Sequence, residues 1–178
     1  TTFQRNDAEK PYEPKNYDGK FRGPVAVRNG LGSSLNIPAV KALSMVGIET
    51  FLSQAYLMGF GTLEPTAKNL QRLGLSVALG GGEVHLIDTT TAFSAFANDG
   101  YKIEPIAILE VKDKLGNILF EQRSAKGPKV MDETEAFLIN DILSDDVARS
   151  LAFGLNSKLN VNPNVAVKTG TTNDQKDN

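Results

Sequence analysis

The residues best suited to carry out chemistry lie near the C-terminus, in the run Lys168-Thr169-Gly170-Thr171. An ammonium group and hydroxyl groups at alternating positions of an extended chain can face one groove, where they can hold a carboxylate. Gly170 would let a ligand or another backbone approach closely. Taken alone, Lys-Thr-Gly is more often a strand end that turns into solvent, so a second motif is needed before the run predicts a site.

A second motif, Ser34-Leu35-Asn36, stands 134 residues before Lys168. It falls in a tight connection between two expected helices, where side chains can point into a cleft. By themselves, Ser34 is most simply a turn hydroxyl and Asn36 a helix cap. Ser-x-Asn followed far downstream by Lys-Thr-Gly, however, supplies two of the three motifs typical of serine penicillin-recognising enzymes. Together the motifs predict a site for acyl transfer.

Hydrophobic spacing predicts the elements that would position these motifs. A period near 3.6 residues predicts helices at about residues 24–31, 38–46, 48–60 and 83–98, and a further helix after a capping-box pattern at Asp132 and Glu135. The period changes to two over residues 106–122, which predicts a β-hairpin, and the run from Val165 to Lys168 predicts another strand. The fold class is therefore α+β, helix-rich with a partial antiparallel sheet.

The same spacing assigns an apolar face to several of these helices. The face of the 38–46 helix is expected to consist of Ala39, Leu43 and Val46. That of the 83–98 helix is expected to consist of Leu86, Thr90, Phe93 and Ala97. These faces should pack into the interior of the domain.

Metal or cofactor chemistry is not expected from this sequence. There are no cysteines and one histidine, His85, so thiolate and multi-histidine metal sites are excluded, and His85 is most simply a surface residue near a helix start. The adjacent carboxylates Asp145 and Asp146 would suit a metal or acid–base pair, but a solvated helix end is the better interpretation. We expect no cofactor and no metal.

Length and composition limit the class of protein further. A chain of 178 residues is one domain by length, and 40% hydrophobic with 22% charged residues is typical of a globular protein. A net charge of −2 argues against a nucleic-acid partner, because no sufficiently basic face is available. No run of 18 apolar residues and no signal-peptide pattern occurs, so no membrane contact is expected from this segment.

Four blocks of sequence carry a resemblance to a known family. They are Asn16 to Val25 (NYDGKFRGPV), Ser34 to Val40 (SLNIPAV), Ala78 to Val84 (ALGGGEV) and Lys168 to Asp174 (KTGTTND). In this order they resemble the transpeptidase domains of bifunctional penicillin-binding proteins, which combine a glycosyltransferase with a transpeptidase. The family's third motif, Ser-x-x-Lys, carries the nucleophile and occurs nowhere in this sequence. The resemblance thus implies that residues 1–178 are a partial transpeptidase domain with an incomplete DD-transpeptidase/β-lactamase-like fold, in which residues 1–22 form an extended lead-in.

The resemblance also implies roles for the motif residues. Ser34 would relay a proton between the lysine of Ser-x-x-Lys and the leaving amine, and Asn36 would hydrogen-bond the substrate amide. Lys168 would supply positive potential, Thr169 and Thr171 would hold the substrate carboxylate, and Gly170 would leave room for the acyl chain.

The implied reaction cross-links peptidoglycan stem peptides that end in D-Ala-D-Ala, with β-lactam antibiotics as mimics. The parent protein would act at the extracytoplasmic face of the bacterial cell membrane, anchored by a segment outside this piece. The fragment itself should be inactive without its nucleophile, and an open sheet edge would favour self-association.

Two alternatives remain open. A β-lactamase-like hydrolase shares Ser-x-Asn and Lys-Thr-Gly, but the Asn16 and Ala78 blocks favour the synthetic enzymes. A non-catalytic cell-wall peptide-binding module would share the ancestry without ever having had a nucleophile. A Ser-x-x-Lys tetrapeptide encoded upstream of Thr1 would exclude the binding module.

Overall fold

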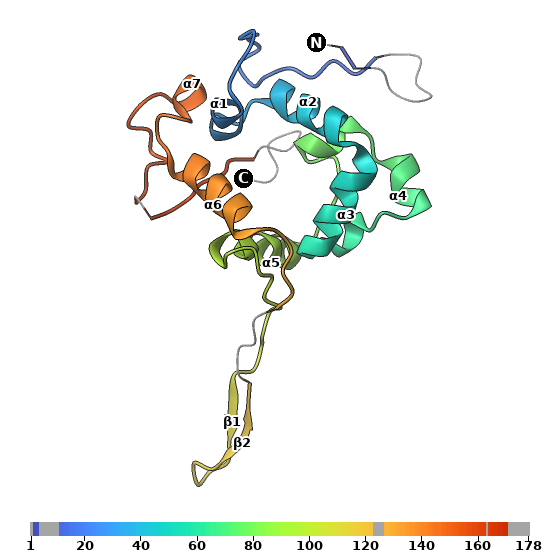
Figure 1. The fold of residues 1–178 in the computed structure, drawn as a ribbon. Helices are drawn as coiled ribbons and strands as arrows, with labels where there is room; N and C mark the ends of the chain where they lie inside the picture. The colour runs from blue at the N-terminus through green and yellow to red at the C-terminus, as the bar shows by residue number, and fades with distance from the viewer. Residues whose placement is uncertain (1, 4–10, 123–126, 163, 171–178) are drawn as a thin grey trace.

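The computed structural model describes residues 2–3, 11–122, 127–162 and 164–170. Its α-helices are α1 (Val27–Gly32), α2 (Asn36–Val46), α3 (Ile48–Met58), α4 (Ala67–Arg72), α5 (Leu86–Ala97), α6 (Glu133–Ser144) and α7 (Ser150–Phe153). Two 3₁₀-helices, η1 (Gly61–Leu63) and η2 (Leu75–Leu79), connect them, and strands β1 (Glu110–Lys112) and β2 (Ile118–Glu121) form one antiparallel pair. The helix-rich α+β architecture predicted from the sequence is confirmed (Figure 1).

Local signals set several helix boundaries. Gly47, with a φ of 88°, separates α2 from α3, and Gly59, with a φ of 118°, ends α3 in a left-handed conformation that side-chain-bearing residues rarely adopt. At the start of α6, Asp132 and Glu135 form the capping box that their spacing predicts. The α3, α5 and α6 helices are therefore confirmed within a few residues of their expected positions.

The main hydrophobic core lies where α2 and α3 pack against the two 3₁₀-helices. Its buried members are Leu43, Leu52, Ala55, Leu63, Leu73 and Val77. On α2 the predicted face is only partly right: Val40 and Leu43 are buried, whereas Ala39 and Val46 are exposed. The reason is that α2 packs against η2, α1 and α3, and the side buried by these contacts includes Val40 and Leu43.

The predicted face of α5 is wrong. The buried residues are the small ones, Thr91, Ala92 and Ala95, whereas Leu86 and Phe93 are 83% and 48% exposed. Small side chains allow α5 to lie close to α3 and α6, its contact partners, so the packed face is the small-residue face. The larger apolar side of α5 is left facing an open pocket, described below.

The β-hairpin extends away from the helical body as a separate projection (Figure 1). Its register pairs Glu110 with Glu121 and Val111 with Phe120, and all residues of both strands are exposed. The turn is closed by the Asp113 carboxylate, whose Oδ1 accepts hydrogen bonds from the backbone N–H groups of Leu115 and Asn117. The predicted hairpin is confirmed.

The strand predicted at Val165 to Lys168 is not formed. The segment is irregular, and its backbone hydrogen bonds run from Val165 N–H to the Asn162 carbonyl and from Val167 N–H to the Leu143 carbonyl. A strand is stabilised by pairing with a neighbouring strand. In the described ranges no strand lies beside this segment, so its β-branched pattern alone does not make a strand.

Candidate functional site

Ser34 and Lys168 meet despite their separation of 134 residues. The Lys168 ammonium donates a hydrogen bond to Ser34 Oγ at 2.7 Å. It also donates to the carbonyl oxygen of Thr169 at 2.5 Å. The prediction that these two motifs share one region of space is therefore confirmed for this pair.

Ser34 occupies a strained turn between α1 and α2. Its φ of 52° is in the left-handed region, which is uncommon for a residue with a side chain. The turn is held by hydrogen bonds from Ser34 N–H to the Leu31 carbonyl and from Leu35 N–H to the Gly30 carbonyl. Strain of this kind costs on the order of 1–3 kcal/mol and persists where the surrounding contacts impose it. Here the hydrogen bonds hold the Ser34 backbone in this conformation.

Asn36 is placed differently from Ser34. It is the first residue of α2, and its side-chain amide donates to the backbone carbonyl of Lys15 at 2.8 Å. The Asn36 amide thus ties the N-terminal segment to the start of the helix. The structure brings Ser34, Lys168 and Thr169 together, but it engages the Asn36 side chain elsewhere.

The remaining predicted residues lie at the end of the described chain. Thr169 contributes its carbonyl to the Lys168 ammonium. A Cβ added at Gly170 would meet no atom within 4 Å, so open space adjoins this position. Thr171 lies outside the described residues.

The environment of Lys168 favours its neutral form more than water does. The residue as a whole is exposed, but partial burial around its ammonium group lowers the pKa of Lys168 from the ordinary lysine value. A pKa lowered by burial of a lysine beside a pocket is a feature that occurs at functional sites.

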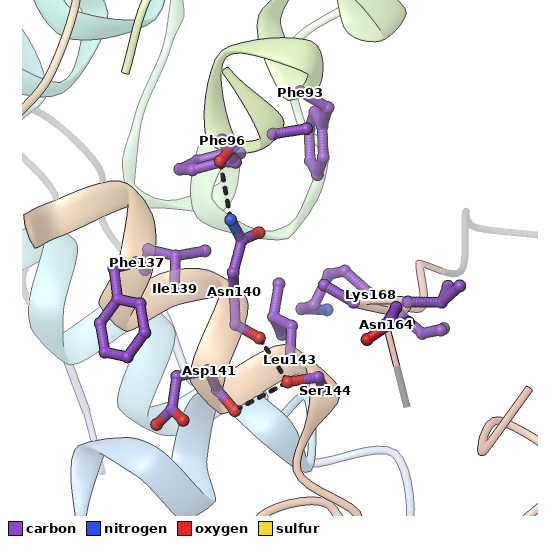
Figure 2. A pocket seen from close by; sticks show the side chains of 14 residues that line it. Phe93, Phe96, Phe137, Ile139, Asn140, Asp141, Leu143, Ser144, Asn164 and Lys168 are labelled. Carbon is purple, nitrogen blue, oxygen red and sulfur yellow. Dashed lines mark hydrogen bonds between the residues drawn. The ribbon is translucent and has the colours of Figure 1, made fainter. Parts of the chain in front are cut away.

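A pocket of about 920 Å³ adjoins Lys168 between α5, α6 and the 164–168 segment (Figure 2). Its walls include the edge-on pair Phe93 and Phe96, with ring centroids 5.8 Å apart, together with Leu143 and Val167. Asn140 crosses from α6 to α5 by donating to the Phe96 carbonyl at 2.7 Å. The pocket is largely apolar, and its lining includes two charged residues, Asp141 and Lys168.

Asn16 supports the Ser34 turn, and sequence reasoning did not assign it a role. Its Oδ1 accepts a hydrogen bond from the backbone N–H of Ile37 at 3.2 Å, and its Nδ2 donates to the Lys20 carbonyl at 2.8 Å. The residue is 6% exposed. Asn16 therefore caps α2 from 21 positions away, although it lies in a segment expected to be a lead-in. The sequence signal at this position is one polar residue in a polar segment, which does not identify a long-range cap.

Asp145 and Asp146 lie at the end of α6, as interpreted from the sequence, but they are partly buried and hydrogen-bonded rather than solvated. Asp145 accepts a hydrogen bond from the Arg28 guanidinium at 2.9 Å, and Asp146 accepts one from the backbone N–H of Asn156 at 2.7 Å. Burial opposes ionisation of Asp145, but the N–H groups of Val147 and Ala148 and the Arg28 guanidinium outweigh it, so the pKa of Asp145 is lowered. These carboxylates hold the chain that follows α6.

Among the described residues, no three or more His, Asp or Glu side chains gather closely enough to hold a metal ion. A search of the same residues finds no helix with the length and apolar character needed to cross a membrane.

Comparison with protein families identifies the family of the chain. The model of the penicillin-binding protein transpeptidase domain matches residues 1–178. The chain belongs to this family. The contact between Ser34 and Lys168 therefore lies within a penicillin-binding protein transpeptidase domain.

Curated relatives agree with this assignment. Penicillin-binding protein 1A of Neisseria flavescens is 31% identical over 94% of this chain and 21% of its own length. Penicillin-binding protein 1A of Clostridium acetobutylicum is 34% identical over 93% of this chain and 20% of its own length. The chain thus spans about a fifth of the length of these relatives.

Solved structures confirm the fold class. Penicillin-binding protein 1A from Haemophilus influenzae is similar with a TM-score of 0.69 and 25% identity, over 83% of this chain and 25% of that one. The D,D-transpeptidase domain of a peptidoglycan glycosyltransferase from Eggerthella lenta has a TM-score of 0.66 and 19% identity, over 80% of this chain and 40% of that one. The expected transpeptidase/β-lactamase-like fold is confirmed.

Proposed function

We propose that this chain supplies one side of the active site of a peptidoglycan DD-transpeptidase, which cross-links stem peptides by acyl transfer. The observation that carries the proposal is the 2.7 Å hydrogen bond from Lys168 Nζ to Ser34 Oγ beside the pocket. Acyl transfer needs its proton-transferring groups within hydrogen-bond reach of one reacting centre, and this contact satisfies that need for two of them.

The geometry supports a proton-relay role for Ser34. Because the Lys168 ammonium donates to Ser34 Oγ, the hydroxyl hydrogen of Ser34 remains free to point at a leaving amine. The hydroxyl would pass its proton to that amine and recover one from the lysine of a Ser-x-x-Lys motif. The nucleophilic serine and that lysine would come from outside residues 1–178, which contain no such tetrapeptide.

Substrate binding would use the Lys168 end of the site. The substrate class is the D-Ala-D-Ala end of a peptidoglycan stem peptide, with β-lactam antibiotics as mimics. The Lys168 ammonium and the hydroxyls of Thr169 and Thr171 would hold its carboxylate, and Gly170 adjoins open space for the acyl chain. Asn36 would hydrogen-bond the substrate amide after exchanging the Lys15 carbonyl for it.

The same proposal covers the setting of the domain. Residues 1–178 would be a partial transpeptidase domain whose parent protein works at the extracytoplasmic face of the bacterial membrane, held there by another segment. No nucleic-acid partner and no cofactor are proposed. In isolation, the 178-residue chain would form no covalent adduct with penicillin, and its open sheet edges would favour self-association.

The test is labelling with a fluorescent penicillin, read by intact mass. The 178-residue chain is compared with the protein expressed from the complete reading frame, each with a Ser34→Ala variant. We expect labelling of the longer protein alone, at a rate that falls in Ser34→Ala. A denaturation-resistant mass shift on the 178-residue chain that is lost in Ser34→Ala would refute the assigned roles.

The same labelling experiment distinguishes the two alternative functions, a β-lactamase-like hydrolase and a non-catalytic peptide-binding module. Rapid release of hydrolysed penicillin would favour a β-lactamase-like hydrolase. Saturable binding without any adduct in the longer protein would favour a peptide-binding module.

A further inference from the structure

The turn that follows α6 is built around a buried arginine. Arg149 is 3% exposed, and its guanidinium donates to the carbonyl of Leu143 at 2.6 Å and to that of Leu159 at 2.9 Å. Its Nε also approaches the carbonyl of Asp145 at 3.5 Å. The last carbonyls of a helix lack partners within the helix, so Arg149 binds acceptors that α6 leaves open.

The Lys168 segment attaches to the same acceptor. The carbonyl of Leu143, already bound by Arg149, also accepts the backbone N–H of Val167 at 2.9 Å. Val167 immediately precedes Lys168. The position of the Leu143 carbonyl therefore limits where the Lys168 side chain can start.

The Ser34 turn attaches to the other end of this same stretch. Ser33 is 2% exposed, and its hydroxyl donates to the carbonyl of Ala148 at 3.0 Å. A Cβ added at Gly32 would come within 2.9 Å of Ala148, so the two backbones are in close contact. Ser33 immediately precedes Ser34, and Ala148 immediately precedes Arg149.

Residues 143–149 thus bind the residue that precedes each motif residue. Leu143 accepts from Val167, next to Lys168, and Ala148 accepts from Ser33, next to Ser34. We propose that Arg149 is a positioning residue for acyl transfer, which sets the approach of Lys168 to Ser34 by fixing the Leu143 end of this stretch relative to the Ala148 end. The proposal rests on the function proposed above, because it assumes that the Ser34–Lys168 contact takes part in the reaction.

The electrostatics of Arg149 support a geometric role. Its nearest carboxylate oxygen, Asp146 Oδ1, is 4.0 Å from Nε and has no hydrogen-bond partner among the described residues. Burying a charge with so weak an ion pair is costly, and apolar packing would usually be at least as stable. What the guanidinium provides, and an apolar residue does not, is a planar fork that reaches the carbonyls of Leu143 and Leu159 at once.

The test measures the second-order rate constant for acylation by a fluorescent penicillin, using the protein expressed from the complete reading frame. Rates are referred to the amount of protein that labels at saturation, so that loss of folded protein does not lower them. Arg149→Met should lower the rate constant by about tenfold to a hundredfold, the size expected when reacting groups are displaced by about 1 Å. Arg149→Lys, which keeps the charge but not the fork, should lie between Arg149→Met and the unaltered protein.

Two further variants separate positioning from stability. Leu52→Ala removes a side chain from the apolar core cluster, which includes none of residues 143–149, so it should lower the melting temperature while leaving the acylation rate constant within about twofold. Ser33→Ala removes the hydrogen bond from Ser33 to the Ala148 carbonyl and should lower the acylation rate constant by about threefold. When Ser33→Ala is combined with Arg149→Lys, the fold-loss in rate constant should be smaller than the product of the two single fold-losses. The reason is that both changes act on the contact between Lys168 and Ser34.

The outcomes are distinct. If Arg149→Lys and Ser33→Ala leave the rate constant unchanged, the positioning role is refuted, and this conclusion holds even if Arg149→Met does not fold. If Leu52→Ala slows acylation as much as Arg149→Lys at an equal melting temperature, the effect is one of stability and the proposal also fails. If the unaltered protein is not acylated at all, it is the proposed function that fails.

Discussion

The α2–α3 region and the region from α6 to Lys168 are held together in different ways. The first is an apolar cluster in which Leu43 and Leu52 are 5% and 0% exposed. The second is largely irregular beyond α6 and depends on hydrogen bonds to backbone carbonyls, among them those of Leu143 and Ala148. Apolar packing tolerates small shifts, whereas hydrogen bonds to fixed carbonyls have strict geometry. Ser34 and Lys168 thus lie next to the region that is held by directional contacts, and the apolar cluster supplies stability.

The largest effect on stability is expected in the apolar cluster. Leu52→Ala should lower the free energy of unfolding by about 2–5 kcal/mol, because the fully buried side chain leaves a cavity. Leu119→Ala in the exposed hairpin is the matched control, since Leu119 is 67% exposed and should change stability by less than about 0.5 kcal/mol. Urea unfolding followed by circular dichroism measures both. Equal losses would contradict the assignment of the core.

An intermediate effect is expected where the two regions of the site touch. Gly32→Ala places a Cβ 2.9 Å from Ala148, so the backbones must separate, at a cost of about 1–3 kcal/mol. Gly74→Ala is the control, because a Cβ there meets nothing within 4 Å. Unfolding free energies and acylation rates are measured on both variants. If Gly32→Ala behaved like Gly74→Ala in both measurements, the close contact between α1 and the 143–149 stretch would be refuted.

A smaller effect is expected at the start of α6. Asp132→Ala removes one half of the capping box and should cost about 1 kcal/mol of unfolding free energy. Asp132→Asn keeps a capping oxygen and should cost less. Thermal unfolding by calorimetry distinguishes them, and an Asn variant as unstable as the Ala variant would argue that the charge of Asp132, which pairs with Lys129, matters more than the cap.

The smallest expected effect is on the stability of the protein at acid pH, through Asp18. The hydrogen bonds from the Arg22 guanidinium and, second, from the Lys20 backbone N–H lower the pKa of Asp18 from 3.8 to about 2. Because the folded pKa lies below the unfolded one, this contribution is fully present above about pH 4 and is lost as the pH falls toward 2. Asp18→Asn should flatten the fall in melting temperature within that window, and Arg22→Gln should reproduce part of the change, because the Lys20 N–H still bonds Asp18. An unchanged acid profile in Asp18→Asn would exclude the contribution.

Much of the helical body could be predicted because its signals are local. The α3 helix followed from apolar spacing, and the α6 start followed from Asp132 and Glu135. The hairpin followed from a change of period and a turn that Asp113 closes. Each of these signals lies within a few residues of the structure that it specifies.

The rest depends on partners that are distant in the chain. The predicted buried face of α5 was wrong because α5 packs through its small residues. The predicted strand before Lys168 was wrong because a strand requires a neighbouring strand, and none lies beside this segment in the described ranges. The meeting of Ser34 with Lys168 was predicted from motif identity alone. The supports at Asn16 and Arg149 were not, because their acceptors and donors are backbone groups of other segments, and no side-chain pattern marks those groups.

The central claim is that Ser34 and Lys168 act together in one acyl-transfer site. A double-mutant cycle with Ser34→Ala and Lys168→Ala, measured as the penicillin acylation rate constant of the protein expressed from the complete reading frame, tests it most directly. Each single variant should lose about 100-fold or more in rate, comparable to the loss of one transition-state donor, and the double variant should lose far less than the product of the two. Strictly multiplicative losses would show that the two groups act independently and would contradict the account.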